Sequence, residues 1–267
     1  MTAYRYPNER VILILTVLLV FTVIAVTAAA TLCGSVLFVL LMMGISYSFT
    51  RSHHQELVKK AHPVTPETAP GLAALAHSCS ERLQADRTKT FVAPKNVLNA
   101  YTFGLSEPYG VVLYSGLLEV MDADEVRFII GHELGHVCLG HTWLNSLIGG
   151  MAGIPSPGVA AVLMYLAFRS WNRACEYSAD RAGLLACGKP QKAASALIKL
   201  VAASSNEDPR QALARIEAED DLLTNNIREL GATHPMIVRR LEALREYAAS
   251  DSYRRLQAKI DQDHPLQ

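Results

Sequence analysis

Hydrophobic residues are concentrated near the start of the chain. Residues 11–49 contain no charged side chain and consist mostly of Val, Ile, Leu, Ala, Met, Phe and Thr. One membrane-spanning helix needs about 20 apolar residues, so this stretch is long enough for two. Small residues at 31–35 interrupt the bulky run and are typical of a turn at the far interface. The pattern predicts a transmembrane helical hairpin in residues 1–52, with helices at 11–29 and 33–50.

Basic side chains flank this hydrophobic stretch at both ends. Positively charged flanks favour the cytoplasmic side, so both ends of the hairpin and the chain that follows are predicted to be cytoplasmic. We therefore expect a multi-pass protein of the cell (inner) membrane, with the lipid bilayer as a partner. A signal peptide that ends near residues 28–30 is the alternative, and it would leave residues 32–49 as an anchor. The flanking residues are Arg5, Arg10, Arg51, Lys59 and Lys60.

A polar segment follows the hairpin. Residues 51–70 contain three prolines and predict a linker, whereas residues 71–85 are rich in Ala and Leu and predict a helix. Thr65 and Glu67 have the residue types of start signals for that helix. The linker and the first helix together make up the expected segment 53–87.

Beyond residue 87, short strands give way to helices. Apolar stretches predict strands at 90–93 and 110–114, with an edge strand at 98–104 between them. The periodicity of most of the remaining chain is helical. We expect an α+β fold, predominantly α, in which residues 88–267 form one domain with a small sheet ahead of a helical body.

The overall composition excludes some classes of function. Lys+Arg and Asp+Glu both count 25, and no basic cluster is dense enough for a nucleic-acid partner. The five cysteines are scattered and odd in number, which is not typical of a disulfide framework and favours a reducing compartment. The oligomeric state cannot be read from the sequence.

The residues His132-Glu133-Leu134-Gly135-His136 form an H-E-x-x-H sequence in an apolar, helical stretch. Positions four apart in a helix lie about 40° from each other and one turn along the axis, so the two imidazoles can bind one ion. Glu133 is adjacent to that face and can take a proton from a zinc-bound water. Asp122 and Glu125 have the residue types that start a helix, as an N-cap and a first-turn acid. The pattern predicts one zinc ion per chain, with Glu133 as the catalytic base.

A catalytic zinc ion usually has three protein ligands. The positions at which metzincins carry Gly and His hold Leu139 and Thr142, which excludes that class. His141 lies about 140° around the helix from His136 and is expected either behind the metal ligands or at the surface. On a second predicted helix, Glu176 can complete the metal site. Asp180, one turn later, can accept the free ring N–H of a ligand histidine.

Several stretches of the chain, taken in order, resemble those of the HtpX and CAAX-prenyl-protease-type metallopeptidases, which are the M48 peptidase family of the gluzincins. The resemblance covers residues 88–245 and implies a zincin-type metallopeptidase domain, with Glu176 as the third zinc ligand and Asp180 supporting a ligand. The matching stretches are 99–104, 115–118, 131–136, 176–180, 233–235 and 240–241.

The resemblance also implies roles for residues outside the H-E-x-x-H helix. His234 would stabilise the oxyanion, or swing onto the zinc ion at rest. From residue types alone it is a histidine at a helix start, where a capping role is the alternative. The edge strand would bind an extended substrate as an added strand. Its expected substrate-binding residues are Asn99, Ala100, Tyr101 and Phe103.

A second uncharged stretch, residues 144–168, contains two prolines and lies between His136 and Glu176. Since both of these residues must reach one ion, the stretch crosses a membrane either twice or not at all. Two spans need about 40 residues, so it is too short for them. We expect a pair of short re-entrant or interfacial helices, or a buried soluble hairpin.

Together these patterns favour a membrane-anchored zinc endopeptidase acting on membrane-associated or misfolded proteins, that is, on protein or peptide substrates. The alternative is a zinc-binding membrane scaffold or chaperone without proteolytic turnover. A gluzincin aminopeptidase would need a carboxylate that holds the free amine of the substrate, as in a Gly-x-Met-Glu-Asn stretch, and the sequence has none.

Overall fold

The computed structural model describes residues 3–30, 34–85, 88–104, 108–142, 159–205 and 237–266. This part of the chain is mostly helical and contains one small mixed sheet, which confirms the predicted class. The helices are α1 (Glu9–Ala30), α2 (Gly34–Lys60), α3 (Pro70–Leu83), α4 (Ser115–Val120), α5 (Ala123–Cys138), α7 (Val159–Cys187), α8 (Pro190–Ser205), α11 (Ile237–Ala249) and α12 (Asp251–Asp263), and the strands are β1 (His62–Pro63), β2 (Thr88–Ala93), β3 (Ala100–Phe103) and β4 (Tyr109–Tyr114).

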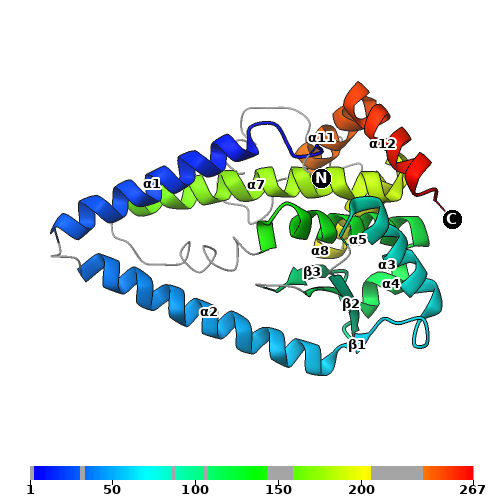
Figure 1. Cartoon of the computed structure of the whole chain (residues 1–267), viewed down its shortest axis with the longest axis horizontal. Coiled ribbons are helices and arrows are strands. Elements are labelled where there is room, and N and C mark those ends of the chain that lie inside the picture. Colours follow the sequence, from blue (N-terminus) through cyan, green and yellow to red (C-terminus); the bar gives the residue numbers. More distant parts are fainter. Residues whose placement is uncertain are drawn as a thin grey trace.

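The first helix, α1, is apolar and largely exposed. Within the described residues, its segment Glu9–Val26 alone is long and apolar enough to cross a membrane, with a mean hydropathy of 2.5. Figure 1 shows α1 lying along α7, whereas α2 starts near the end of α1 and diverges from it toward the sheet. Helix α2 continues to Lys60, past the expected end at residue 50, so the first half of the predicted linker is helical. A second span in α2 stays a prediction.

The connection between α2 and α3 differs from the predicted one. Thr65 and Thr68 form a turn in which the Thr65 N–H donates to Thr68 Oγ1 at 2.9 Å. The prediction that Thr65 and Glu67 start the next helix is therefore wrong, because α3 begins at Pro70. Proline suits that position, since the N–H groups of a first helical turn have no partner within the helix.

The four strands of the sheet have the order β1-β2-β4-β3. Strands β2 and β4 are parallel, and β3 pairs antiparallel with β4. This order confirms that β3 is an edge strand. Side chains of a strand alternate between its two faces. Accordingly, Ala100 packs against the main core and Thr102 faces α5, whereas Tyr101 and Phe103 join a smaller hydrophobic cluster.

Helices α5 and α7 pack against each other at the centre of the domain (Figure 1). Glycines permit the close approach. A Cβ on Gly131 would lie 2.4 Å from Ala186 Cβ, and one on Gly135 would lie 2.6 Å from Ala182 Cβ. Such distances are far inside van der Waals contact, so no larger residue fits without moving one helix. The two glycines therefore bring the neighbouring residues of α5 close to α7.

Helix α7 is one continuous helix that begins within the second apolar stretch. The expected pair of short helices is wrong for residues 159–168, which form the first turns of α7. The earlier part of that stretch, up to residue 158, lies outside the described residues. Side chains of α7 pack with apolar side chains of α1, which joins the candidate span to the domain. These residues are Phe168, Trp171, Cys175 and Met164 on α7, and Ile12, Leu13 and Val20 on α1.

The C-terminal helices pack around the other end of α7. Helix α11 contacts α7 and α8, and α12 contacts α7. The fully buried Arg82 of α3 ties α12 in place, because its guanidinium donates to Asp261 at 2.6 Å and to the Leu185 carbonyl at 3.0 Å. This packing places α11 against the part of α7 that carries Asp180.

Candidate metal centre

The first turn of α5 is fixed by a capping box, as the residue types predicted. The Asp122 carboxylate accepts from the backbone N–H of Asp124 and Glu125, and the Glu125 carboxylate accepts from the N–H of Asp122. Ser195 and Lys199 of α8 also donate to Glu125, at 2.6 and 2.7 Å. These bonds anchor the helix that carries the H-E-x-x-H sequence.

Three side chains from α5 and α7 converge on one point. The Nε2 atoms of His132 and His136 are 3.3 Å apart. Each of these nitrogens lies 3.6 Å from a carboxylate oxygen of Glu176. The structure therefore brings together the three residues that were predicted to share an ion.

The spacing of these atoms fits a tetrahedral zinc site. Ligand atoms about 2.0–2.1 Å from a zinc ion lie about 3.3–3.4 Å from each other in a tetrahedron. The two Nε2 atoms are 3.3 Å apart, and each lies 3.6 Å from one oxygen of Glu176, His132 from Oε2 and His136 from Oε1. Two imidazole nitrogens and one carboxylate are also a donor set of catalytic zinc sites, which leave the fourth position for water or substrate. The residues present therefore fit a zinc ion.

The ring of His132 is held by Asp180, whose Oδ1 lies 3.0 Å from His132 Nδ1. Arg240 of α11 binds Asp180 through Nε at 2.7 Å and Nη2 at 2.5 Å, and its Nη1 lies 3.1 Å from Glu176. Burial would raise the pKa of Asp180, but the charge and hydrogen bonds of Arg240, with those of His132, keep it low. An ionised acceptor at Nδ1 leaves the lone pair on His132 Nε2 free for a metal ion.

The other histidine of the candidate metal site, His136, is supported by a different residue. Its Nδ1 lies 3.0 Å from Nδ1 of His141, and His141 is only 2% exposed. His141 was expected either behind the metal ligands or at the surface, and the structure places it behind His136. Burial holds the pKa of His136 well below its usual value, and a proton on either neighbouring histidine would lower it further. The ring is therefore neutral, as a metal ligand must be.

Glu133 lies beside this cluster, and its carboxylate is buried. The hydroxyl of Thr102 on β3 donates to Glu133 Oε2 at 2.5 Å, and the same oxygen lies 3.1 Å from the Glu133 carbonyl oxygen. Burial raises the pKa of Glu133, and the charge of His132 and the bond from Thr102 offset only part of this rise. A carboxylate with a raised pKa is suited to proton transfer, because it can hold the proton that it takes.

Comparison with known proteins decides the family. The model of Peptidase family M48 matches residues 66–248. This chain belongs to peptidase family M48. The predicted resemblance is therefore confirmed, and membership makes the protein a metallopeptidase.

Individual relatives of this M48 peptidase agree with that assignment. A protein named Protease HtpX homolog from Moorella thermoacetica is 28% identical, over 85% of this chain and 88% of its own length. Another Protease HtpX homolog, from Pyrococcus furiosus, is 27% identical over 70% of this chain and 77% of its own length. The plastoglobule-localized metallopeptidase 48 of Arabidopsis thaliana is 28% identical over 73% of this chain and 62% of its own length.

The predicted substrate-binding residues of this M48 peptidase lie on or next to β3. Asn99 precedes the strand, where its carbonyl accepts from Tyr114 N–H at 3.1 Å and its side chain accepts from Ala100 N–H at 3.0 Å. The aromatic side chains of Tyr101 and Phe103 pack on the face opposite Thr102. Among the described strands, β3 pairs only with β4, so its other backbone edge has no strand partner within the described residues. The four residues stay predicted substrate-binding residues.

Other residues of the M48 peptidase site were missed by the sequence reasoning or stay untested. His234 lies outside the described residues. Thr102 was overlooked between Tyr101 and Phe103, although strand alternation turns it to the opposite face. Arg240 stood in a stretch that matched the family, but no role was assigned to it. Thr102 contacts the carboxylate of Glu133, and Arg240 contacts those of Asp180 and Glu176.

Proposed function

We propose that this protein is a zinc-dependent endopeptidase of the cell membrane, with His132, His136 and Glu176 as its metal ligands. The observation that carries the proposal is the convergence of these side chains within 3.6 Å beside the buried Glu133. A zinc ion held there would polarise the scissile carbonyl and lower the pKa of a bound water.

The residues of the chain supply the remaining parts of the reaction. Glu133 takes a proton from the attacking water and passes it to the leaving amine, while Thr102 orients its carboxylate. Asp180 keeps the ring of His132 in place. The edge strand β3 binds an extended substrate through its free backbone groups, as an added strand. His234 stabilises the developing oxyanion, a role that rests on the family resemblance.

The arrangement of the N-terminal segment supports an anchored protein over one with a cleaved leader. The Arg5 guanidinium donates to the Leu139 carbonyl at 3.1 Å, and the Tyr6 N–H donates to Ser178 Oγ at 2.8 Å. Removal of residues before 30 would break these contacts with the catalytic domain. Exposed apolar residues at the start of α7, such as Val162 at 57%, lie on the helix that runs along α1. They support substrates that are membrane-associated or misfolded. The cytoplasmic orientation rests instead on the basic residues that flank the apolar N-terminal stretch.

The variant Glu133→Gln tests the proposed function. The detergent-purified variant should bind one zinc ion per chain, as the wild type does, but digest an unfolded protein about 10²–10⁴-fold more slowly. Glu176→Ala is the matched variant that should lose the zinc ion as well. Digestion by Glu133→Gln at the wild-type rate would refute the assignment of the base. A wild type that binds zinc without hydrolysing any protein would favour the scaffold or chaperone.

A further inference from the structure

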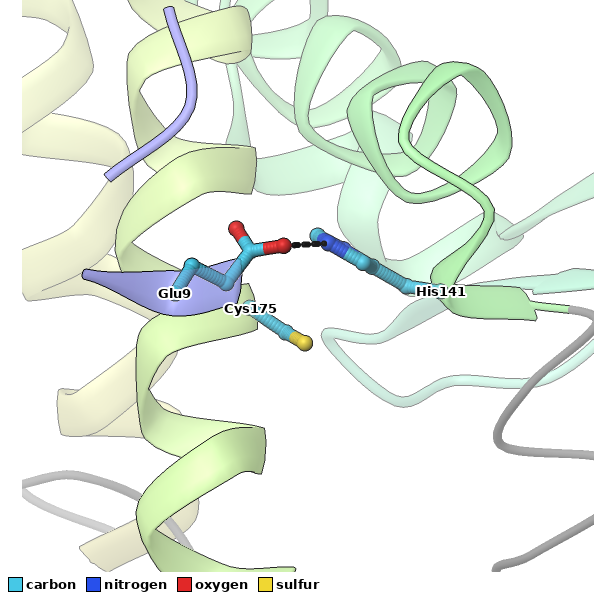
Figure 2. Close-up of side chains that lie close together, drawn as sticks. All are labelled: Glu9, His141 and Cys175. Carbon is cyan, nitrogen blue, oxygen red and sulfur yellow. Dashed lines mark hydrogen bonds and ion pairs between the residues drawn. The ribbon is translucent and has the colours of Figure 1, made fainter. Parts of the chain in front are cut away.

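A second group of ionisable side chains lies directly behind the proposed metal ligands. Glu9 from the start of α1, His141 from the end of the α5 region and Cys175 of α7 are close together and buried (Figure 2). Glu9 is 1% exposed and His141 is 2% exposed. A buried carboxylate is costly unless other groups bind it. Nothing in the reaction described above uses Glu9, so its burial has to be explained.

Glu9 is the end of a chain of hydrogen bonds that starts at a metal ligand. His136 Nδ1 lies 3.0 Å from His141 Nδ1, and His141 Nε2 lies 3.0 Å from Glu9 Oε1. An ionised carboxylate can only accept, so His141 must donate from Nε2. A neutral imidazole has a single N–H, and His141 therefore accepts at Nδ1. His136 then donates from Nδ1, which leaves the lone pair on its Nε2, the atom that faces His132 and Glu176.

Several contacts hold Glu9 in the orientation that this chain requires. Arg5, four residues before Glu9 and outside α1, forms an ion pair with it, and the Ser178 hydroxyl donates to the second oxygen of Glu9. Ser178 in turn accepts from the N–H of Tyr6 at 2.8 Å. Ser178 lies on α7 between Glu176 and Asp180, so the N-terminal segment is attached to the helix that supplies the third metal ligand.

The same three side chains are a poor site for a second metal ion. The guanidinium of Arg5 already pairs with the Glu9 carboxylate, so a cation there would meet a positive charge. Both ring nitrogens of His141 and both oxygens of Glu9 have partners. In Figure 2 the Cys175 thiol lies beside the bond between Glu9 and His141 and takes no part in it.

We infer that Glu9 is a positioning residue for the metal centre, which orients His136 through His141. This inference deepens the proposed function and rests on it. Asp180 supports His132 from α7, whereas His136 is supported from the N-terminal segment that leads into the candidate membrane span. The metal site is therefore complete only when that segment is docked on the domain.

The test measures zinc affinity of the full-length protein in detergent, by competition with a chelator. Glu9→Gln keeps the shape of the side chain but removes the charge that fixes the tautomer of His141. It should weaken zinc binding about 10–100-fold, the effect typical of groups that support a ligand histidine. In Co²⁺-loaded protein, the visible absorption bands should also change, because the donor strength of His136 changes.

Two companion variants separate this role from general packing. Thr16→Val removes the contacts of Thr16 Oγ1 with the carbonyls of Ile12 and Ala167, on the same helix but away from the chain of bonds. It should leave zinc affinity and the Co²⁺ spectrum unchanged. His141→Asn breaks the chain, and in its background Glu9→Gln should cause no further loss, because coupled residues are not additive.

The outcomes distinguish this inference from the proposed function. Glu9→Gln with wild-type affinity and spectrum would overturn the inference, and so would an equal loss with and without His141. If the wild type bound two zinc ions per chain and Glu9→Gln bound one, the inference would be wrong and Glu9 would instead be a ligand of a second metal ion. A wild type that binds no zinc would instead refute the proposed function. Should Glu9→Gln fail to fold, wild-type affinity and spectrum in His141→Asn would still overturn the inference.

Discussion

Replacing Arg240 by Met should strongly destabilise the metal-free protein. The Arg240 guanidinium makes two hydrogen bonds to Asp180, at 2.5 and 2.7 Å, and lies 3.1 Å from Glu176. Asp180 is 2% exposed, so water cannot take over these bonds. Methionine keeps the apolar stem of the side chain and removes the charge. The change therefore isolates the electrostatic contribution of Arg240 to the stability of the protein.

The expected loss follows from the burial of the pair. Removal of one partner from a buried ion pair costs about 3–5 kcal/mol. Without Arg240, the buried Asp180 keeps its contact with His132 but loses both hydrogen bonds from the guanidinium. Arg254→Met is the matched control, because Arg254 forms an ion pair with Asp251 at 2.8 Å while the two side chains are 68% and 79% exposed. Exposed pairs contribute about 0–1 kcal/mol, so the control should barely change stability.

Urea titration of detergent-solubilised, metal-free protein measures the loss of stability in both variants. Tryptophan fluorescence, to which the buried Trp171 contributes, gives the signal. Addition of Asp180→Asn to Arg240→Met should restore part of the stability, because no buried negative charge then lacks a partner. A loss for Arg240→Met within about 1 kcal/mol of that for Arg254→Met would refute the reasoning that this buried network needs its cation.

Two further predictions concern the helix that carries His132 and His136. Gly135→Ala should lower the free energy of unfolding by about 1–3 kcal/mol and weaken zinc binding, because the added methyl group pushes α7 away. Gly71→Ala is the control and should not destabilise the protein, since nothing lies within 4 Å of its added Cβ. Urea titration measures the stability of both variants, and chelator competition measures their zinc affinity. Because burial raises the pKa of Glu133, its ionised form destabilises the folded state, so metal-free Glu133→Gln should be more stable than the wild type at pH 7. That difference should vanish as the pH falls below the ordinary value of 4.5, and a difference that persists there would contradict this cause.

The sequence by itself determined the features that depend on neighbouring residues. The H-E-x-x-H spacing places two imidazoles on one face of any helix, and Asp122 with Glu125 starts that helix through a capping box that involves only its first turn. The edge strand and the apolar N-terminal helix were also predictable, because alternation and length are local signals. The start of α3 was not, since the Thr65–Thr68 turn competes with helix initiation there.

Glu176 and Asp180 were expected from the sequence, but only the tertiary structure showed that Arg240 and Glu9 lie behind the site. Arg240 reaches Asp180 across 60 positions, and Glu9 reaches His141 across 132 positions, because glycines let α5 and α7 approach closely and other helices pack around them. Sequence spacing carries no information about such contacts. These contacts follow from the packing of apolar helix faces, which brings distant polar groups together. Buried charges are stable only where this packing places a partner beside them.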